Sequence, residues 1–322
     1  MRKYSIISLF AGCGGLDLGF LGDFTFMSKK YSPRKFEMVG ANDINEPACR
    51  TFRKNFGHDI VCGDINEILE GKNNSLFDNP IPKRADIVLG GFPCQDFSHA
   101  GKRRGFNSKR GTLYQSMVEV VKNTKPFLFL AENVKGLLTM YDGEAIRTII
   151  KDFEDLGYHV EPRLYLAADY EVPQMRERVI IVGTRKDKLP PFKHPKKKLN
   201  QENWIPVKEA IKDLEHLNEG DFVNHFWSKA KKNRGQGNNS IDANKPSPTM
   251  RAEHHGNIEY HWNGTRRLSA REAARIQSFP DDFVFLPSTS SAYRQIGNAV
   301  PPVMAWHIAA SVENFLDKNL KT

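Results

Sequence analysis

Short apolar runs alternate with helical patterns over roughly the first 185 residues of the chain. Unbroken apolar runs are typical of buried strands, whereas apolar residues at every third or fourth position indicate helices. Strands are predicted over residues 5–9, 36–41, 60–62, 86–89, 127–130, 159–166 and 179–182. Helices are predicted over residues 16–21, 47–55, 112–122 and 144–156, with Pro47 and a capping box at Thr112 as start signals. This alternation predicts an α/β fold with a doubly wound, mostly parallel sheet.

The pattern changes after Gly183. Residues from about 187 to 260 are rich in Lys, Asn, Pro, Gly and His, and they show no clear period. Periodicity returns near Leu268, where Ser269 and Glu272 have the spacing of a helix start, and a last amphipathic helix is predicted over residues 303–316. We therefore divide the chain at residues 1–189, 190–262 and 263–322.

Composition narrows the class of protein. The chain has 322 residues and a net charge of +9, which weakly favours a polyanionic partner. The mean hydropathy is −0.53 and no apolar stretch has the length of a membrane span or a signal-peptide core. The cysteines have no CxxC spacing and form no zinc-type cluster with histidines, so no metal site is expected. A reducing cytoplasm is the simplest setting for such a chain.

Cys94 is the first candidate for chemistry. It follows the apolar run at residues 87–89 within the segment Phe92-Pro93-Cys94-Gln95. Open α/β sheets place their active sites at the carboxyl ends of strands, and the basic neighbours Lys102 and Arg103 favour a thiolate nucleophile there. A buried, inert cysteine is the alternative, and the local sequence does not decide between them.

A glycine-rich segment, residues 10–17, joins the first strand to the first helix. Glycines let a ligand approach the backbone, but Asp17 stands where the dinucleotide fingerprint needs its third glycine, which disfavours NAD. Asp43 and Asp64 end the second and third strands, where acids can accept ribose hydroxyls or an adenine amino group. Two acids without a phosphate cradle suit a cationic nucleoside such as S-adenosylmethionine. Helix capping is the alternative role for each acid.

Two further groups belong to the same edge of the predicted sheet. Glu132 follows the strand at residues 127–130, and a carboxylic acid beside a nucleophile suits covalent attack on an electron-poor ring. Gln174, Arg176 and Arg178 alternate before the next strand and therefore point to one side. They are either a guanidinium fork for a base carbonyl or phosphate, or a solvated strand face. A cap or an ion pair is the alternative for Glu132.

Six segments, in their order and spacing, closely resemble the motifs of the cytosine-5 DNA methyltransferases. They are residues 10–15, 92–95, 132–134, 174–178, 267–283 and 297–301. The resemblance covers nearly the whole chain. The length of the chain is similar to that of the bacterial restriction–modification members of the family. It implies a sequence-specific enzyme that flips cytosine out of double-stranded DNA and methylates carbon 5 from S-adenosylmethionine. It also implies host protection in the bacterial cytoplasm beside an independently acting restriction endonuclease.

The resemblance assigns roles position by position. Cys94 would attack carbon 6 of cytosine, Glu132 would hold ring nitrogen 3, and Arg178 would hold the carbonyl oxygen with Arg176 and Gln174 in support. The matching cofactor positions are Phe10, Gly12, Gly14, Asp43, Ile44, Asp64, Ile65, Asn298 and Ala299. The expected DNA contacts are Ser98, Lys102, Arg103, Gln174, Arg234 and Gln236. Two positions depart from common members: Phe92 replaces Pro, and Ile44 offers the adenine an apolar wall without an aromatic ring.

The resemblance also implies a separate role for each of the three parts of the chain. Residues 1–189 would form the catalytic and cofactor-binding domain, with a basic loop at 98–111 that closes over DNA. Residues 190–262 would read the target sequence, and residues 263–322 would return to the catalytic domain through the final helix. A solvated loop is the alternative for residues 98–111, and a flexible basic linker is the alternative for the basic stretch at residues 228–239.

Three rival functions stay open at this point. An NAD-dependent oxidoreductase is disfavoured by Asp17, and a catalytically inactive DNA-binding subunit is disfavoured by the presence of Cys94, Glu132 and Arg178. A tRNA cytosine-5 methyltransferase of the same superfamily is the third rival. The length of the region after residue 190 favours duplex DNA over RNA without deciding the matter.

Overall fold

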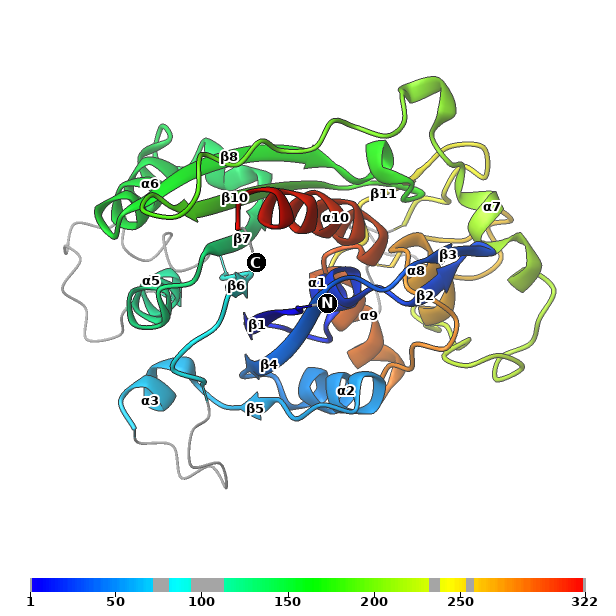
Figure 1. The fold of residues 1–322 in the computed structure, drawn as a ribbon. Helices are drawn as coiled ribbons and strands as arrows, with labels where there is room; N and C mark the ends of the chain where they lie inside the picture. The colour runs from blue at the N-terminus through cyan, green and yellow to red at the C-terminus, as the bar shows by residue number, and fades with distance from the viewer. Residues whose placement is uncertain (1, 72–80, 94–112, 232–237, 253–257, 321–322) are drawn as a thin grey trace.

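A seven-stranded sheet with strand order β5-β4-β1-β6-β7-β10-β8 forms the centre of the molecule (Figure 1). The computed structural model describes residues 2–71, 81–93, 113–231, 238–252 and 258–320. The strands are β1 (Tyr4–Leu9), β4 (Phe36–Asp43), β5 (Val61–Cys62), β6 (Ile87–Gly90), β7 (Leu128–Val134), β8 (Tyr158–Leu166) and β10 (Glu177–Arg185). Neighbours pair in parallel from β5 to β7, and only β10 runs antiparallel to both its neighbours. The predicted doubly wound, mostly parallel sheet is confirmed.

Two strands extend further than the sequence pattern indicates. β7 runs to Val134 and β10 begins at Glu177, because their antiparallel ladder continues to the pair Arg178–Val134. Glu132 and Arg178 therefore lie inside strands, whereas the apolar runs had placed them in the flanking segments. Polar residues can extend a strand when a partner strand supplies its hydrogen bonds.

Helices cover both faces of the sheet because successive strand residues alternate between the faces. Ile6 and Leu89 pack in the apolar cluster that contains residues of α1 (Gly15–Leu21) and α10 (Pro302–Asn319). Ile7 and Val88 face the cluster built with α5 (Leu113–Thr124) and α6 (Glu144–Asp155). The helices α2 (Glu46–Phe56) and α3 (Ile65–Leu69) follow β4 and β5.

The second half of the chain is less regular. It holds short elements: η3 (Gln201–Asn203), α7 (Val207–Ile211), η4 (Lys212–Leu214), β11 (Ser247–Pro248), α8 (Ala270–Ile276) and α9 (Thr289–Asn298). Ser269 and Glu272 form the predicted capping box at the start of α8. The sequence pattern did not predict the hairpin of β2 (Phe24–Phe26) and β3 (Lys29–Tyr31), the short strand β9 (Gln174–Met175), or the 3-10 turns η1 (Lys135–Leu138) and η2 (Ala167–Tyr170).

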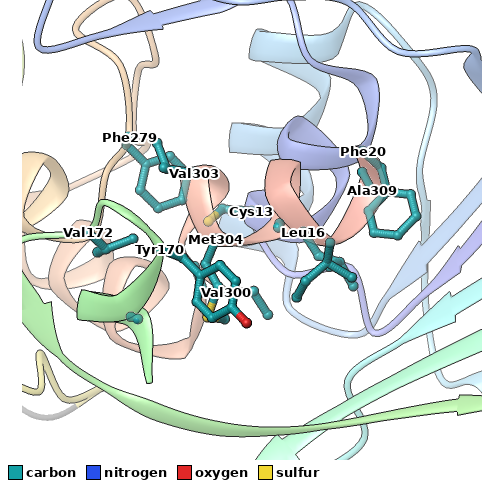
Figure 2. Packing of buried hydrophobic residues seen from close by; sticks show 14 of the residues in the cluster. Cys13, Leu16, Phe20, Tyr170, Val172, Phe279, Val300, Val303, Met304 and Ala309 are labelled. Carbon is teal, nitrogen blue, oxygen red and sulfur yellow. The ribbon is translucent and has the colours of Figure 1, made fainter. Parts of the chain in front are cut away.

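The C-terminal helix α10 packs against the N-terminal part of the chain. Figure 2 shows Val300, Val303 and Met304 packed with Cys13 and Leu16 in one apolar cluster. At the other end of α10, the carboxylate of Asp317 accepts a hydrogen bond from the hydroxyl of Tyr4, at 3.0 Å. The domain limits proposed at residues 189 and 262 remain predictions. In the part of the chain that the structure describes, no helix has the length and apolar character needed to cross a membrane.

Candidate active site

The candidate active site lies at the carboxyl edge of the parallel strands. β1 pairs with β4 on one side and β6 on the other, so the chain leaves β1 and β6 in the crevice where the strand order reverses. Ligands of open α/β sheets bind at such a switch point. The loop after β1 carries the glycine-rich segment, and the loop after β6 leads through Gly91 toward Cys94. The topology therefore brings two of the predicted motifs to adjacent strand ends.

The glycine-rich loop has a backbone that few side chains would allow. Phe10, Gly12 and Gly14 all have positive φ, at 54°, 58° and 92°. A Cβ atom on Gly14 would lie 2.2 Å from Cε2 of Phe56, so this glycine lets the loop pack on α2. A Cβ atom on Gly12 would meet nothing within 4 Å, which leaves open space beside its backbone. A ligand can therefore approach the loop at Gly12.

Asp43 ties this loop to the end of β4. Its Oδ2 accepts a hydrogen bond from the backbone N–H of Gly12 at 2.7 Å, and its Oδ1 accepts one from the N–H of Asn45 at 2.8 Å. Burial raises the pKa of Asp43, and these N–H donors oppose that shift. Ile44 follows and is 69% exposed, although isoleucine is ordinarily buried. An exposed apolar side chain beside a carboxylate fits a nucleoside, with its apolar base and its hydroxyl-bearing sugar.

The remaining predicted cofactor residues surround the same strand ends. Asp64 caps α3 by accepting a hydrogen bond from the N–H of Asn66, so the capping alternative describes its geometry here. Ile65 is buried in the core, whereas Asn298 is exposed. Ala299 approaches the glycine loop, since a Cβ on Gly15 would lie 3.1 Å from the Cβ of Ala299. The end of α9 thus reaches the loop after β1, as expected for a segment that closes the pocket.

Glu132 and Arg178 form an ion pair on neighbouring strands, with 2.6 Å between Oε1 of Glu132 and Nε of Arg178. Each side chain is only 12% exposed. A Cβ atom on Gly91 would lie 3.2 Å from Oε2 of Glu132, so the segment that leads to Cys94 passes directly beside this carboxylate. The pair can hold a planar polar ring from two sides, through a carboxyl group and a guanidinium group.

Asn133 is a functional candidate that the sequence did not single out. Its Nδ2 donates a hydrogen bond to the carbonyl oxygen of Phe92 at 2.9 Å, and the contact is buried. The ring of Phe92 is itself buried against Tyr114. These contacts fix the backbone two residues before Cys94. In the sequence, Asn133 stands out only as the amide that follows Glu132. Its contact with Phe92 cannot be predicted from the sequence, because it depends on β6 lying beside β7.

Gln174 and Arg176 are fully buried, and their side chains form hydrogen bonds with segments that are distant in the sequence. Gln174 accepts a hydrogen bond from the N–H of Met250 at 2.9 Å and donates to the side chain of Gln277. Arg176 donates to the carbonyl oxygens of Met250 at 2.9 Å and Gly297 at 2.8 Å. The predicted alternation is present, since Met175 between them is exposed. Direct contact of Gln174 with DNA remains a prediction, and the geometry gives it a positioning role.

Arg267 is a second residue that the sequence did not single out individually. Its Nε donates to the carbonyl oxygen of Ala230 at 2.9 Å, and its Nη1 donates to that of Ile258 at 2.5 Å. One buried guanidinium group thus joins two separate segments of the irregular region to the segment before α8. Cys94, Ser98, Lys102, Arg103, Arg234 and Gln236 lie outside the described residues.

Fold and site together define an α/β enzyme that binds a nucleoside cofactor at a switch point and a polar ring beside it. Comparisons with known proteins identify the family to which this enzyme belongs. The model of the C-5 cytosine-specific DNA methylase family matches residues 4–246 and 217–314. The chain belongs to this family, and it is therefore a DNA cytosine-5 methyltransferase with S-adenosylmethionine as its methyl donor.

Individual relatives agree with this family. The chain is 41% identical to the type II methyltransferase M.NgoFVII of Neisseria gonorrhoeae over 97% of this chain and 87% of that protein. It is 35% identical to M.FnuDI of Fusobacterium nucleatum over 97% and 94% of the two chains. The Dnmt2 methyltransferase of S. pombe has the same fold, with a TM-score of 0.67 at 15% identity over the full length of both chains. The oxidoreductase, inactive-subunit and tRNA readings are not favoured.

Proposed function

We propose that this chain is the modification enzyme of a type II restriction–modification system, and that it methylates a cytosine within one short duplex sequence. The chain belongs to the C-5 cytosine-specific DNA methylase family, and its relatives M.NgoFVII and M.FnuDI are both named type II methyltransferases. Host protection requires a separate endonuclease of the same specificity, which would act independently in the bacterial cytoplasm. Double-stranded DNA is the substrate.

The observation that carries the catalytic assignment is the Glu132–Arg178 pair beside Gly91. Arg178 would hold the carbonyl oxygen of the flipped cytosine, while Glu132 would bond to or protonate ring nitrogen 3. Cys94 would form the bond from sulfur to carbon 6, and the electron pair would move into the ring toward carbon 5. After methylation, carbon 5 loses its proton and the bond between sulfur and carbon 6 breaks, which frees Cys94.

The cofactor assignment follows from the open space at Gly12 and from the exposed Ile44. We propose that Asp43 and Asp64 hold the adenosine part, with Phe10, Gly12, Gly14, Asn298 and Ala299 around the rest. When bound, S-adenosylmethionine supplies an electrophilic methyl group. The hydrogen bonds that Asp43 accepts from the N–H groups of Gly12 and Asn45 keep the carboxylate oriented before the cofactor arrives.

Trapping with a suicide substrate tests the nucleophile. DNA with 5-fluorocytosine in the target cannot lose the carbon 5 substituent as a proton, so the wild-type protein should remain covalently attached. Cys94→Ser should form no adduct and keep its affinity for S-adenosylmethionine in isothermal titration. Glu132→Gln should slow methyl transfer by about 10²–10⁴-fold, as loss of a general acid does, whereas the exposed Glu37→Gln control should not. An adduct with Cys94→Ser would refute the assignment.

Expression in a methylation-free host tests the restriction–modification role. Bisulfite sequencing should show protected cytosines in one recurring sequence, and that DNA should resist an endonuclease that cuts there. Scattered methylation without a common sequence would contradict the proposal. We further propose that residues 190–262 choose the sequence, since Arg176 and Arg267 join this region to the catalytic edge mainly through its backbone carbonyl groups.

A further inference from the structure

A group of three metal-ligating side chains lies where α2 begins beside β5, and the proposed methyl transfer uses none of them. A carboxylate oxygen of Glu46 and the sulfur atoms of Cys49 and Cys62 all lie within 4.8 Å of one another. The linear sequence gave no sign of this group, since the two cysteines are too far apart for a CxxC motif. Glu46 is exposed, Cys62 is half-buried and Cys49 is buried. The group is therefore reachable from solvent on one side.

The fold fixes the positions of all three residues. The parallel pairing of β4 with β5 sets Cys62 opposite Asp43. Asn45 caps α2 by accepting a hydrogen bond from the N–H of Ala48, which places Glu46 in the first turn. The sulfur of Cys49 lies 3.5 Å from the carbonyl oxygen of Asp43, so the Cys49 side chain lies over the end of β4. A preformed site of this kind needs little rearrangement to accept an ion.

We propose that Glu46, Cys49 and Cys62 bind a thiophilic divalent cation, for which Zn²⁺ and Cd²⁺ are the natural probes. Zinc binds sulfur at about 2.3 Å and carboxylate oxygen at about 2.0–2.2 Å in a tetrahedron, which requires ligand atoms about 3.5–4 Å apart. Atoms already within 4.8 Å of one another reach that spacing by small rotamer changes. Three protein ligands leave the fourth position to water.

The charges around the group agree with a cation. Burial raises the pKa of the Cys49 thiol, so binding displaces one proton from each thiol into solvent as the two metal–sulfur bonds form. Two thiolates and one carboxylate around a divalent ion carry a net charge of −1. The guanidinium of Arg53, whose Nη1 lies 3.7 Å from Oε1 of Glu46, partly offsets that charge. Both side chains of this ion pair are exposed, so the Glu46 carboxylate can leave Arg53 and bind the metal at little cost in free energy.

Metal titration of the reduced full-length protein tests the site. Zn²⁺ should bind at one equivalent in isothermal titration, and Co²⁺ should give the absorption of a cobalt–thiolate bond. The partly exposed variants Cys62→Ser and Glu46→Gln should each weaken binding strongly. We expect at least about a hundredfold loss for Cys62→Ser, because even outer-shell partners of metal sites account for about ten- to hundredfold in affinity. The buried Cys13→Ser, away from the group, is the matched thiol control and should bind as the wild type does.

Thiol protection gives a second, independent measurement. Bound Zn²⁺ should shield the half-buried Cys62 from iodoacetamide, as mass spectrometry of the peptides would show, whereas Cys13 is buried with or without the ion and should be unaffected. Failure of the verified reduced wild-type protein to bind Zn²⁺ would overturn the proposal. Equal affinity in Cys62→Ser, or protection of other cysteines only, would overturn it as well. None of these outcomes depends on the methyltransferase assignment.

Discussion

The Glu132–Arg178 pair shows how single residues prepare this site. Each group is largely buried, and each supplies the charge that the other needs to remain in a poorly solvated position. In the proposed catalytic role, the flipped cytosine would replace this one charged contact by two hydrogen bonds of matching polarity. Asn133, on the same strand, holds the backbone that leads to Cys94. Positioning residues of this kind act on rate through geometry, without contact with the substrate.

Asn133→Ala should therefore impair methyl transfer without affecting the cofactor. The substitution leaves the buried carbonyl of Phe92 without its donor, at a cost of about 1–3 kcal/mol. We expect kcat to fall by about 10–100-fold through misplacement of the nucleophile, with KM for S-adenosylmethionine unchanged. Steady-state methylation assays measure both values. Val134→Ala, at an exposed neighbour, is the control, and equal rates in the two variants would contradict the positioning role.

Asp17→Asn should stabilise the protein above neutral pH. Asp17 is fully buried, and among the described residues neither carboxylate oxygen has a hydrogen bond of ordinary geometry, although the nearby hydroxyl of Ser8 partly opposes the effect of burial on its pKa. Burial raises the pKa of Asp17 to about 6, above the ordinary value of 3.8. The folded state thus holds the proton more tightly, so stability decreases as pH rises from about 4 to about 6 and stays lower above that range.

Urea unfolding at pH 5 and pH 7.5 measures this effect. The asparagine variant should gain on the order of 1–3 kcal/mol at pH 7.5 and less at pH 5, because it carries no ionisable group. Asp23→Asn, at an exposed site, should show no such pH-dependent gain. A loss of stability in Asp17→Asn at pH 7.5 would mean that the carboxylate has a stabilising partner.

At the scale of elements, close backbone contacts join the return segment to the catalytic edge. The end of α9 lies against the segment after β11, and both accept hydrogen bonds from Arg176 between β9 and β10. A Cβ atom on Gly297 would lie 2.2 Å from the carbonyl carbon of Arg251. Since main chain cannot rotate away as a side chain can, this position requires glycine.

Gly297→Ala should accordingly destabilise the protein by about 1–3 kcal/mol, the usual cost of overpacking. It should also weaken S-adenosylmethionine binding, because Ala299 follows two residues later and approaches Gly15 of the glycine loop. Thermal unfolding and isothermal titration measure the two effects. Gly136→Ala is a suitable control, since its Cβ would meet nothing within 4 Å. Unchanged stability in Gly297→Ala would show that the two segments can separate.

Over the whole molecule, Glu171 connects three distant parts of the chain. Its Oε2 lies 2.7 Å from Nε2 of His307 on α10, and its Oε1 accepts a hydrogen bond from Nζ of Lys29 on β3 at 2.6 Å. The hydrogen bond with His307, assisted by Lys29, lowers the pKa of Glu171 to about 2. A depressed acid pKa stabilises the fold above the unfolded value of 4.5, and that stability is lost as pH falls toward 2.

Glu171→Gln should reduce the free energy of unfolding at pH 7 by about 1–3 kcal/mol, the cost of losing a partly buried charged hydrogen bond. The difference in unfolding free energy from the wild-type protein should shrink as pH falls below about 4.5. Below that pH, the stabilisation that the ionised Glu171 carboxylate gives the wild-type protein begins to be lost. Denaturation curves at pH 7 and pH 3.5 would show this convergence. The exposed Glu37→Gln variant should behave as the wild type, and a constant difference across pH would exclude the charge-based explanation.

The sequence by itself determined the α/β class, because strand and helix periodicity and the glycine turn are local properties. It indicated the family through the resemblance of six ordered motifs. The position of Asp43 at the end of its strand and the helix cap at Ser269 could be predicted from such local properties. The hairpin at β2 and β3 and the extension of β7 could not be, since hydrogen bonds from a partner strand decide them. The tertiary structure alone decided that Asn133 holds Phe92, that Arg176 joins Met250 to Gly297, and that Cys49 meets Cys62. Each of these contacts joins residues from different elements, and their spacing along the chain carries no record of the strand order that brings them together.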